Sequence, residues 1–270
     1  MLTLASVNPI LFHLGPITVR WYGVIFVTGI MVAIWLAMKA AEHRGGLDPE
    51  FIPDLSMFLV PGGILGARLY EVFVLSWPYY RLHPSEILAI WQGGLAIHGG
   101  VLGALLLGGI YVWYRKQPFW LWADMIGPGL ILAQAIGRWG NFFNQEAFGS
   151  PAPDWLVTKM PAWLREGMTI QGTVMHPTFL YESLWNLLVF GILFAIQRRK
   201  PAAGVVFSLY LIGYNIGRYA IESIREDSTI FGGGLRVAQV AALLEILAGL
   251  GFLAYHLWRA RAKQSPSEPA

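Results

Sequence analysis

The polar run between Gly137 and Gly149 is the part of this sequence best suited to chemistry. It reads Gly-Arg-Trp-Gly-Asn-Phe-Phe-Asn-Gln-Glu-Ala-Phe-Gly, and within nine residues it brings together the candidate side chains Arg138, Asn141, Asn144 and Glu146. An arginine that reaches from a membrane span to the interface would explain one of these residues. It would not explain two asparagines, a glutamate and the glycines between them. We therefore interpret this run as a ligand site.

A second set of polar residues follows one helical face. Tyr214, Arg218, Glu222 and Arg225 are spaced by four, four and three residues, which places them on one side of a helix. An internal salt bridge between Arg218 and Glu222 is the structural alternative. Because the arginine precedes the glutamate, which is the weaker order for stabilising a helix, we favour a role in the site.

Other ionisable residues lie within apolar stretches, where each costs free energy to insert. His98 has glycines on both sides, which lets a substrate come close, so we favour a functional role. For Glu182 the functional and structural interpretations are equally supported. For Arg68 and Glu71 we favour a structural role in which the two opposite charges neutralise each other. For Asp124 we also favour a structural role, because a carboxylate near a helix start interacts favourably with the helix dipole.

The elements that carry these residues are strongly apolar. The chain has 270 residues, of which 56% are hydrophobic and 13% charged, whereas soluble domains carry about 25% charged residues. About seven stretches reach the roughly 20 residues that a membrane span needs: 19–41, 53–76, 94–114, 119–139, 178–197, 202–223 and 237–258. The sequence predicts an all-α integral membrane protein with about seven transmembrane helices.

Basic residues are concentrated in alternate connections. The short connections on one side hold Lys39, Arg44, Arg115, Lys116, Arg198 to Lys200, Arg259, Arg261 and Lys263. The longer connections on the other side hold Arg20, Arg81, Lys159, Arg165, Arg225 and Arg236. The positive-inside rule places the first set in the cytoplasm, which predicts an N-terminus outside and a cytoplasmic C-terminus. Topology explains the basic clusters, so no nucleic-acid partner is expected.

The spans predict a single polytopic membrane domain over residues 1–258 and a disordered cytoplasmic tail over 259–270. The segment of about 141–177 is too apolar for a linker and predicts a small outward-facing cap, partly helical near 153–166. Pro177 suits the first turn of the helix that follows.

Arginines near the outer boundary indicate a phosphate ligand. Arg138, Arg218 and Arg225 carry the planar, permanently charged fork that binds phosphate. The phosphate naturally present at that depth is a phospholipid headgroup, so the residues themselves predict a site for an anionic phospholipid, with His98 as a possible base. The chain has no cysteine and its histidines lack close metal-ligand spacing, so neither a metal nor a cofactor is expected.

At this point the residues resemble a known family. Gly137 to Gly149 is similar to the signature of the bacterial prolipoprotein diacylglyceryl transferases, and the likeness extends along nearly the whole chain. It includes, in order, Arg20 to Gly23, His98 to Gly100, His176-Pro177 with Tyr181-Glu182, and Tyr214 with Arg218 and Glu222. The sequence departs from the family pattern after Arg225, where a proline is missing, and partly between Gly234 and Gln239.

The resemblance implies a reaction in the bacterial cytoplasmic (inner) membrane. The diacylglyceryl group of phosphatidylglycerol moves to the lipobox cysteine thiol of a prolipoprotein, a thioether forms, and glycerol 1-phosphate leaves. His98 is the expected base, with Glu146 or Glu222 as alternatives, and Arg138 and Arg218 would stabilise charge on the leaving phosphate.

The remaining roles are assigned in the same way. We expect Asn141 and Asn144 to donate to headgroup oxygens, Glu146 and Glu222 to orient the arginines, and Tyr22 to bind the lipid. The expected substrate-binding residues are Tyr22, Arg138, Asn141, Asn144, Glu146, Gly149, Glu182, Tyr214 and Glu222.

Three other functions are compatible with parts of the pattern. A transporter or channel could hold a buried anion site, although repeats and polar residues at mid-membrane would then be expected. A membrane scaffold would leave Arg138 to Glu146 unexplained. A different enzyme that uses phosphatidylglycerol could modify another acceptor.

Overall fold

The computed structural model describes residues 7–15, 17–226 and 236–262. Their contacts divide the chain into two compact units, Met1–Arg44 with Ala123–Ala270, and Gly45–Trp122. The first unit holds the long helices α1 (Trp21–Arg44), α5 (Phe119–Asn144, from Ala123 onwards), α8 (Thr178–Arg198), α9 (Val205–Glu222) and α10 (Val237–Ala262). Of the ionisable residues considered as site candidates from the sequence, Arg68, Glu71 and His98 lie in the second unit. The others lie in this first unit.

Small residues let α1 and α5 approach closely. A Cβ atom added to Gly29 would lie 3.2 Å from the carbonyl oxygen of Ala133, and one added to Gly129 would lie 2.7 Å from that of Ala33. Backbones can come this near only where side chains are small. This contact fixes α1 against the helix that carries Arg138.

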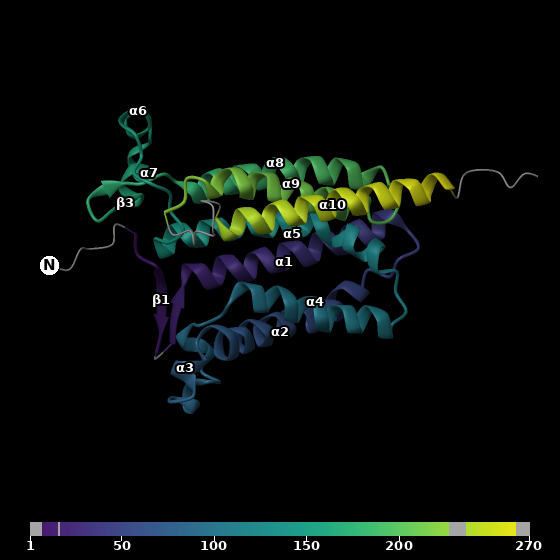
Figure 1. The fold of residues 1–270 in the computed structure, drawn as a ribbon, viewed down its shortest axis with the longest axis horizontal. Coiled ribbons are helices and arrows are strands. Elements are labelled where there is room, and N and C mark those ends of the chain that lie inside the picture. The colour runs from purple at the N-terminus through teal and green to yellow at the C-terminus, as the bar shows by residue number, and fades with distance from the viewer. Residues whose placement is uncertain (1–6, 16, 227–235, 263–270) are drawn as a thin grey trace, which may run out of the picture. The chain divides into compact units, whose positions relative to one another are not determined.

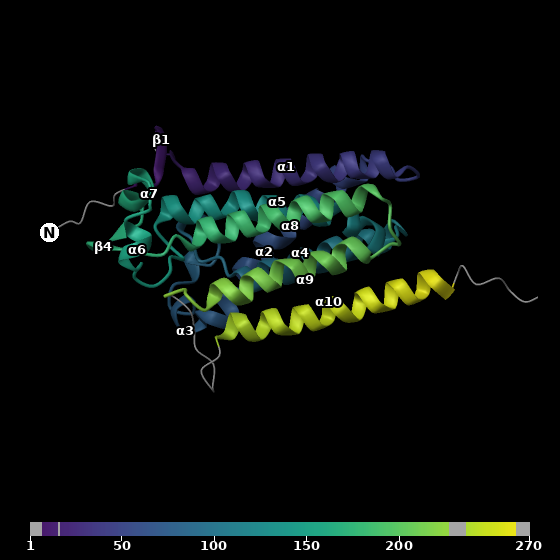
Figure 2. The same cartoon turned by 90° about the horizontal axis from the view of Figure 1, so that it is seen from above.

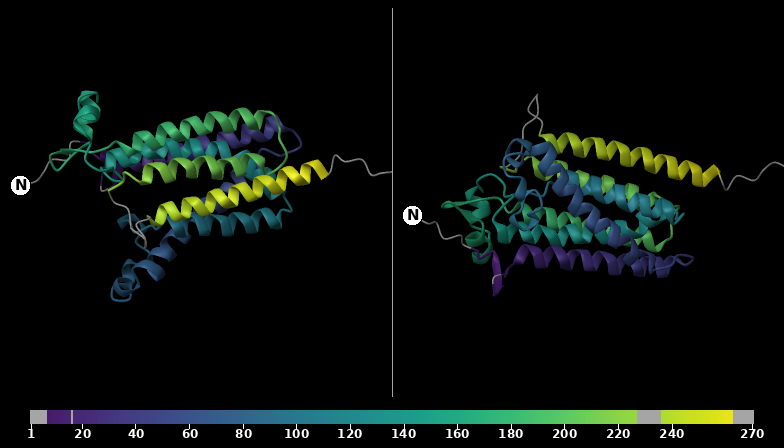
Figure 3. Two further views of the ribbon diagram at one scale, coloured as in Figure 1. Left: turned by 45° about the horizontal axis from the view of Figure 1, so that its top comes forward. Right: turned by 90° about the horizontal axis from the view of Figure 1, so that it is seen from below.

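The other helices of the first unit pack around an apolar cluster between α5, α8 and α9. Its buried members are Ile131, Val189, Leu193, Val206 and Tyr210. Helix α9 also lies alongside α10 (Figure 3), and a Cβ atom on Gly249 of α10 would meet the carbonyl oxygen of Ser208 at 3.1 Å. Three helices that bear site residues are therefore held by ordinary core packing.

Asp124 has a structural role, but at a different helix from the one expected. Its buried carboxylate accepts hydrogen bonds from the backbone amides of Gly204 at 2.7 Å and Phe207 at 2.8 Å. Gly204 is the N-cap residue of α9 and Phe207 lies in its first turn, where backbone donors have no partner within the helix. Asp124 thus caps α9 from the side of α5.

The second unit is a pair of helices, α2 (Phe51–Tyr70) and α4 (Ile97–Tyr114), which lie side by side (Figure 1). A π-helical turn, η1 (Glu71–Leu75), continues α2, and three short elements follow: α3 (Trp77–Tyr80), η2 (Pro84–Glu86) and η3 (Ile90–Gln92). Facing glycines set the helix spacing, since a Cβ atom on Gly62 would lie 2.8 Å from the carbonyl oxygen of Gly103.

The expected neutralisation of Arg68 by Glu71 is wrong. Arg68 is buried and donates to the carbonyl oxygens of Glu86, Ile87, Gly93 and Gly94 at 2.6 to 2.9 Å. Glu71 instead accepts a hydrogen bond from Ser76 at 2.7 Å. The arginine is used to fold the loop between α3 and α4, because backbone carbonyls satisfy its donors.

Two small β-hairpins complete the first unit. The hairpin β1 (Ile10–Leu14) and β2 (Ile17–Arg20) precedes α1 and was not predicted. The cap contains α6 (Asp154–Val157), α7 (Ala162–Gly167), and the strands β3 (Thr169–Ile170) and β4 (Thr173–Val174). Figure 1 shows these cap elements gathered near the start of α8. The prediction of helix near 153–166 is confirmed, although α5 continues to Asn144, past the boundary expected near 141.

Six helices of the described residues are long and apolar enough to cross a membrane: α1, α2 with η1, α4, α5, α8 and α10. The chain is therefore a multi-pass, mostly helical membrane protein. The expected span over 202–223 is also helical, as α9, but its polar residues keep it out of this set. Helix α10 continues to Ala262, beyond the expected boundary at 258, and residues 263–270 lie outside the described part.

Candidate active site

Three helix ends of the first unit meet at the candidate site. The C-terminal half of α5 lies against α9 through a hydrogen bond from Gln134 to the Tyr210 hydroxyl at 3.0 Å. The start of α8 is joined to α5 by a hydrogen bond from Ser183 to the carbonyl oxygen of Ala135, also at 3.0 Å. Figure 2 shows α5, α8 and α9 running alongside one another. This packing brings residues distant in sequence to one place.

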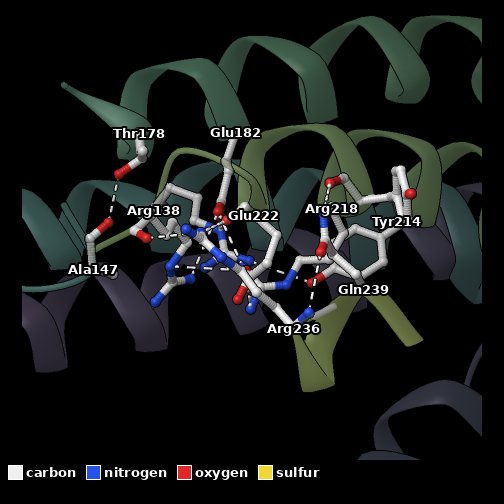
Figure 4. Close-up of polar contacts among 11 residues, drawn as sticks. Arg138, Ala147, Thr178, Glu182, Tyr214, Arg218, Glu222, Arg236 and Gln239 are labelled. Atoms are coloured by element: carbon white, nitrogen blue, oxygen red, sulfur yellow. Dashed lines mark hydrogen bonds and ion pairs between the residues drawn. The ribbon is translucent and has the colours of Figure 1, made fainter. Parts of the chain in front are cut away.

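Glu182 lies at the centre of an arginine cluster (Figure 4). One of its carboxylate oxygens, Oε2, forms an ion pair with Arg138 Nε. The other, Oε1, lies 3.3 Å from Arg218 Nη1 and 3.8 Å from Arg225 Nη1. The glutamate side chain is only 7% exposed. It therefore joins arginines from α5, from α9 and from the segment after α9.

A second buried glutamate completes the cluster. Glu222 Oε2 lies 2.9 Å from Arg218 Nη2 and 3.9 Å from Arg225 Nε. The internal salt bridge of α9 considered from the sequence is therefore present, but Arg218 also contacts Glu182 on α8. One arginine thus serves both the local ion pair and the contact between helices.

Arg236 extends the cluster from the start of α10. Its Nη1 atom donates to the carbonyl oxygen of Arg225 at 2.7 Å and also to that of Glu222. Gln239 supports it by accepting a hydrogen bond from the Arg236 backbone amide at 3.2 Å. These contacts hold the end of α9 and the arginine that follows it.

Tyr214 contacts the cluster one turn before Arg218. Its hydroxyl accepts a hydrogen bond from Arg138 Nη2 at 3.3 Å. Because Arg138 Nε faces Glu182, the guanidinium is held on two sides by residues of α8 and α9. A guanidinium fixed in this way keeps its fork in one orientation, as bidentate binding of a phosphate requires.

The end of the polar run between Gly137 and Gly149 is hydrogen-bonded to the segment that carries Arg225. Gly149 and Arg225 form an antiparallel bridge, and the amide of Ser150 donates to the carbonyl oxygen of Ile224 at 2.8 Å. A Cβ atom on Gly149 would lie 2.7 Å from the His176 Cβ atom and 2.9 Å from the Ile224 carbonyl oxygen. Close packing therefore requires a glycine at position 149, directly beside Arg225.

Asn141, Asn144 and Glu146 lie where α5 ends. Asn144 Nδ2 donates to Glu146 Oε1 at 3.3 Å, and the Glu146 amide donates to the carbonyl oxygen of Asn141. Glu146 forms no ion pair with an arginine among the described residues, so the expectation that it orients one is wrong. Glu182 contacts Arg138 and Arg218 in its place.

Tyr22 lies at the start of α1 and packs against Gly140 of the polar run. A Cβ atom on Gly140 would lie 2.6 Å from Tyr22 Cδ2, so only glycine leaves room for this ring. The adjacent Trp21 stacks on Phe143 with ring centroids 4.9 Å apart. The first turn of α1 is therefore placed over the last turns of α5.

His98 belongs to the second unit. It is the second residue of α4, its side chain is exposed, and its ring centroid lies 6.2 Å from that of Tyr70. This exposed position leaves the imidazole accessible, as a proton acceptor must be.

Sequence reasoning identified most of the cluster but missed Arg236. In the sequence, Arg236 was counted only as a charge in an outer connection. The sequence signal for Arg236 was its position directly before the last apolar helix, α10, since the preceding helix, α9, ends in Glu222. Residues 227–235, where most of the departure falls, lie outside the described part.

Among the described residues, the cluster holds more arginines than glutamates. Arg138, Arg218 and Arg225 form ion pairs with Glu182 or Glu222, and Arg236 donates to the carbonyl oxygens of Glu222 and Arg225. Groups of one charge in a poorly solvated region strongly favour a ligand of the opposite charge. The fold and this cluster define a multi-pass membrane protein with a site suited to an anionic headgroup.

Comparison with known proteins agrees with this class. The family model described as prolipoprotein diacylglyceryl transferase matches residues 9–255. The phosphatidylglycerol–prolipoprotein diacylglyceryl transferase of Symbiobacterium thermophilum is 62% identical over 96% of each chain. Those of Geobacillus kaustophilus and a Nostoc species are 46% and 43% identical, over 92% and 95% of this chain and 92% of theirs. The chain belongs to the prolipoprotein diacylglyceryl transferase family.

Proposed function

We propose that this protein transfers the diacylglyceryl group of phosphatidylglycerol to the lipobox cysteine thiol of a prolipoprotein. The single observation that supports this most is the arginine cluster held by the buried carboxylates of Glu182 and Glu222. Family membership supports the same reaction, because the relatives are named for phosphatidylglycerol and prolipoprotein. The transfer forms a thioether and releases glycerol 1-phosphate.

The arginines are proposed to act on the leaving group. When the thiolate attacks the glyceryl carbon, the C–O bond to the phosphate breaks and its electron pair stays on the phosphate oxygen. Arg138 and Arg218 would stabilise this charge in a poorly solvated site, where such contacts are most effective. Glu182 and Glu222 hold the two guanidinium groups in place and so avoid the cost of ordering them during the reaction.

The proton of the attacking thiol needs an acceptor, because a free thiol has a pKa of about 8.5. His98 remains our candidate, since imidazole accepts a proton near neutral pH. Glu222 is engaged by Arg218 at 2.9 Å, which leaves Glu146 as the carboxylate alternative. Tyr22, Asn141 and Asn144 are proposed to bind the polar part of the lipid, and Gly149 to maintain the backbone beside Arg225.

The membrane arrangement is proposed to include α9 as a seventh span. Its polar residues Asn215, Arg218 and Glu222 have partners in the neighbouring helices or their own, as buried polar groups in a membrane require. Seven spans and the distribution of basic residues give an N-terminus outside and a C-terminus in the cytoplasm of the bacterial inner membrane. One membrane domain over 1–258 is proposed to contain both units.

The test uses the full-length protein in nanodiscs, a synthetic lipobox peptide and mass spectrometry. With phosphatidylglycerol, the peptide should gain the mass of one diacylglyceryl group, and a Cys→Ser peptide should gain none. Phosphatidylcholine in place of phosphatidylglycerol should give no product. Modification of the serine peptide, or no modification of the cysteine peptide by folded protein, would overturn the proposal.

A further inference from the structure

The first unit has a cavity at the end of α8 that carries no part of the candidate active site. Its volume is about 240 Å³, and its lining comes from the last turns of α1, the first turns of α5 and the last turns of α8. Since a helix rises about 1.5 Å per residue, Arg198 lies about 24 Å along α8 from Glu182. The cavity is therefore separate from the arginine cluster.

Four basic side chains line the cavity: Lys39, His43, Arg44 and Arg198. Arg44 donates to the carbonyl oxygen of Pro201 through Nη2 at 2.9 Å, while its Nη1 atom is buried and has no hydrogen-bond partner in the described residues. A buried donor of this kind costs free energy unless a partner satisfies it. The cavity therefore has both positive charge and an unused buried donor.

The carboxylates close to these basic groups leave the positive charge in excess. Lys39 pairs with Glu42 at 2.8 Å, but both side chains are about half exposed, and such surface pairs are weak. Asp124 is already occupied by the amides of Gly204 and Phe207. Neither carboxylate prevents an anion from binding at Arg44 and Arg198.

The rest of the lining is apolar, which indicates an amphiphile. Leu36, Met125 and Phe194 contribute carbon surface to the cavity, and the helices that carry them are three of the candidate membrane spans. A free phosphate ion would gain nothing from this surface. The cavity is smaller than the roughly 300 Å³ of pockets for drug-sized ligands, so it suits a headgroup and the first part of a chain.

We propose that this cavity binds an anionic phospholipid, with the phosphate against Arg44, Lys39 and Arg198 and an acyl chain along Leu36 and Phe194. Basic pockets between membrane helices recognise lipid phosphates in this way. The site lies at the opposite ends of α5 and α8 from the arginine cluster and so holds a lipid of the opposite leaflet. This assignment does not depend on the transfer reaction, because none of its residues belongs to the proposed active site.

The experiment uses full-length protein in nanodiscs and phospholipids that carry a photoactivatable group on the acyl chain, with adducts mapped by peptide mass spectrometry. Photoactivatable phosphatidylglycerol should label residues 36–44, 125–129 and 194–198, and photoactivatable phosphatidylcholine should not. This comparison needs no variant. Equal labelling of these peptides by both lipids would overturn the proposal.

A pair of double variants tests the charged contacts. The variant Lys39→Gln with Arg198→Gln should reduce labelling of the three peptides about tenfold at subsaturating lipid, since each basic residue contributes to headgroup binding. The control variant Arg259→Gln with Arg261→Gln removes the same charge from exposed positions at the end of α10. Labelling of the three peptides should be unchanged in this control. Equal effects of the two variants, or strong competition by inorganic phosphate in place of the lipid, would contradict the assignment.

Discussion

Arg218 Nη1 lies 3.3 Å from Glu182 Oε1, although the two residues are on different helices and 36 positions apart. The same glutamate also pairs with Arg138 of α5. One buried carboxylate therefore fixes guanidinium groups from α5 and α9 in a single place.

The variant Glu182→Gln should destabilise the protein strongly. Breaking a buried ion pair by removing one partner costs about 3–5 kcal/mol, because the remaining charge is left uncompensated. Thermal unfolding in detergent measures the loss. Glu42→Gln is the matched control, because it removes a half-exposed carboxylate that pairs with Lys39 and should cost less than about 1 kcal/mol. Similar losses for both variants would show that Glu182 does not hold the cluster.

The variant Gly140→Ala should impair transfer by displacing Tyr22. Its new methyl group would lie 2.6 Å from Tyr22 Cδ2, and such overpacking typically costs about 1–3 kcal/mol. The initial rate of peptide modification measures the effect. Gly137→Ala lies one turn earlier on the same helix, and its methyl group would meet nothing within 4 Å. If Gly137→Ala slows transfer as much as Gly140→Ala, the contact with Tyr22 is not the cause.

The variant Asp124→Ala should lower stability without removing activity. The amides of Gly204 and Phe207 would lose their buried acceptor, and each unsatisfied buried donor costs about 1–3 kcal/mol. We expect a lower melting temperature together with a transfer rate close to that of the parent well below the transition. Asp124→Asn retains one acceptor, so its melting temperature should lie between those of Asp124→Ala and the parent. An unchanged melting temperature for Asp124→Ala would contradict the capping role.

The first unit shows which features could be predicted from sequence. Each apolar run must satisfy its backbone hydrogen bonds internally in a membrane, so all seven expected segments could be recognised as helices. The joint position of Arg138, Arg218 and Glu222 also followed, because spaced charges in apolar helices must face a common interior.

The central position of Glu182 could not be predicted, because its ion pairs depend on how α8 packs against α5 and α9. The role of Arg236 was missed for the same reason, since it donates to backbone carbonyls at and just after the end of α9. Arg68 was paired with Glu71 because they are close in sequence, whereas its real partners are loop carbonyls 18 to 26 positions away.

The variant His98→Gln should slow transfer without affecting lipid binding. Loss of a general base typically reduces the rate by about 10²–10⁴, whereas headgroup binding depends on the arginines. Peptide modification measures the rate, and native mass spectrometry measures phosphatidylglycerol retention. His83→Gln, an exposed histidine of the same unit, is the control and should retain full activity. A near-normal rate in His98→Gln would assign the proton to another group, with Glu146 tested next.

The proposed phosphate site is tested most directly by kcat/KM for lipobox-peptide modification in Arg138→Ala and Arg165→Ala. Arg165 lies exposed on α7 of the cap, so its loss removes the same charge outside the cluster. We predict that Arg138→Ala loses about 100-fold or more, as when a transition-state donor is removed, while Arg165→Ala remains within about twofold of the parent. Equal rates for folded Arg138→Ala and Arg165→Ala would contradict the assignment of the arginine cluster to the phosphate of phosphatidylglycerol.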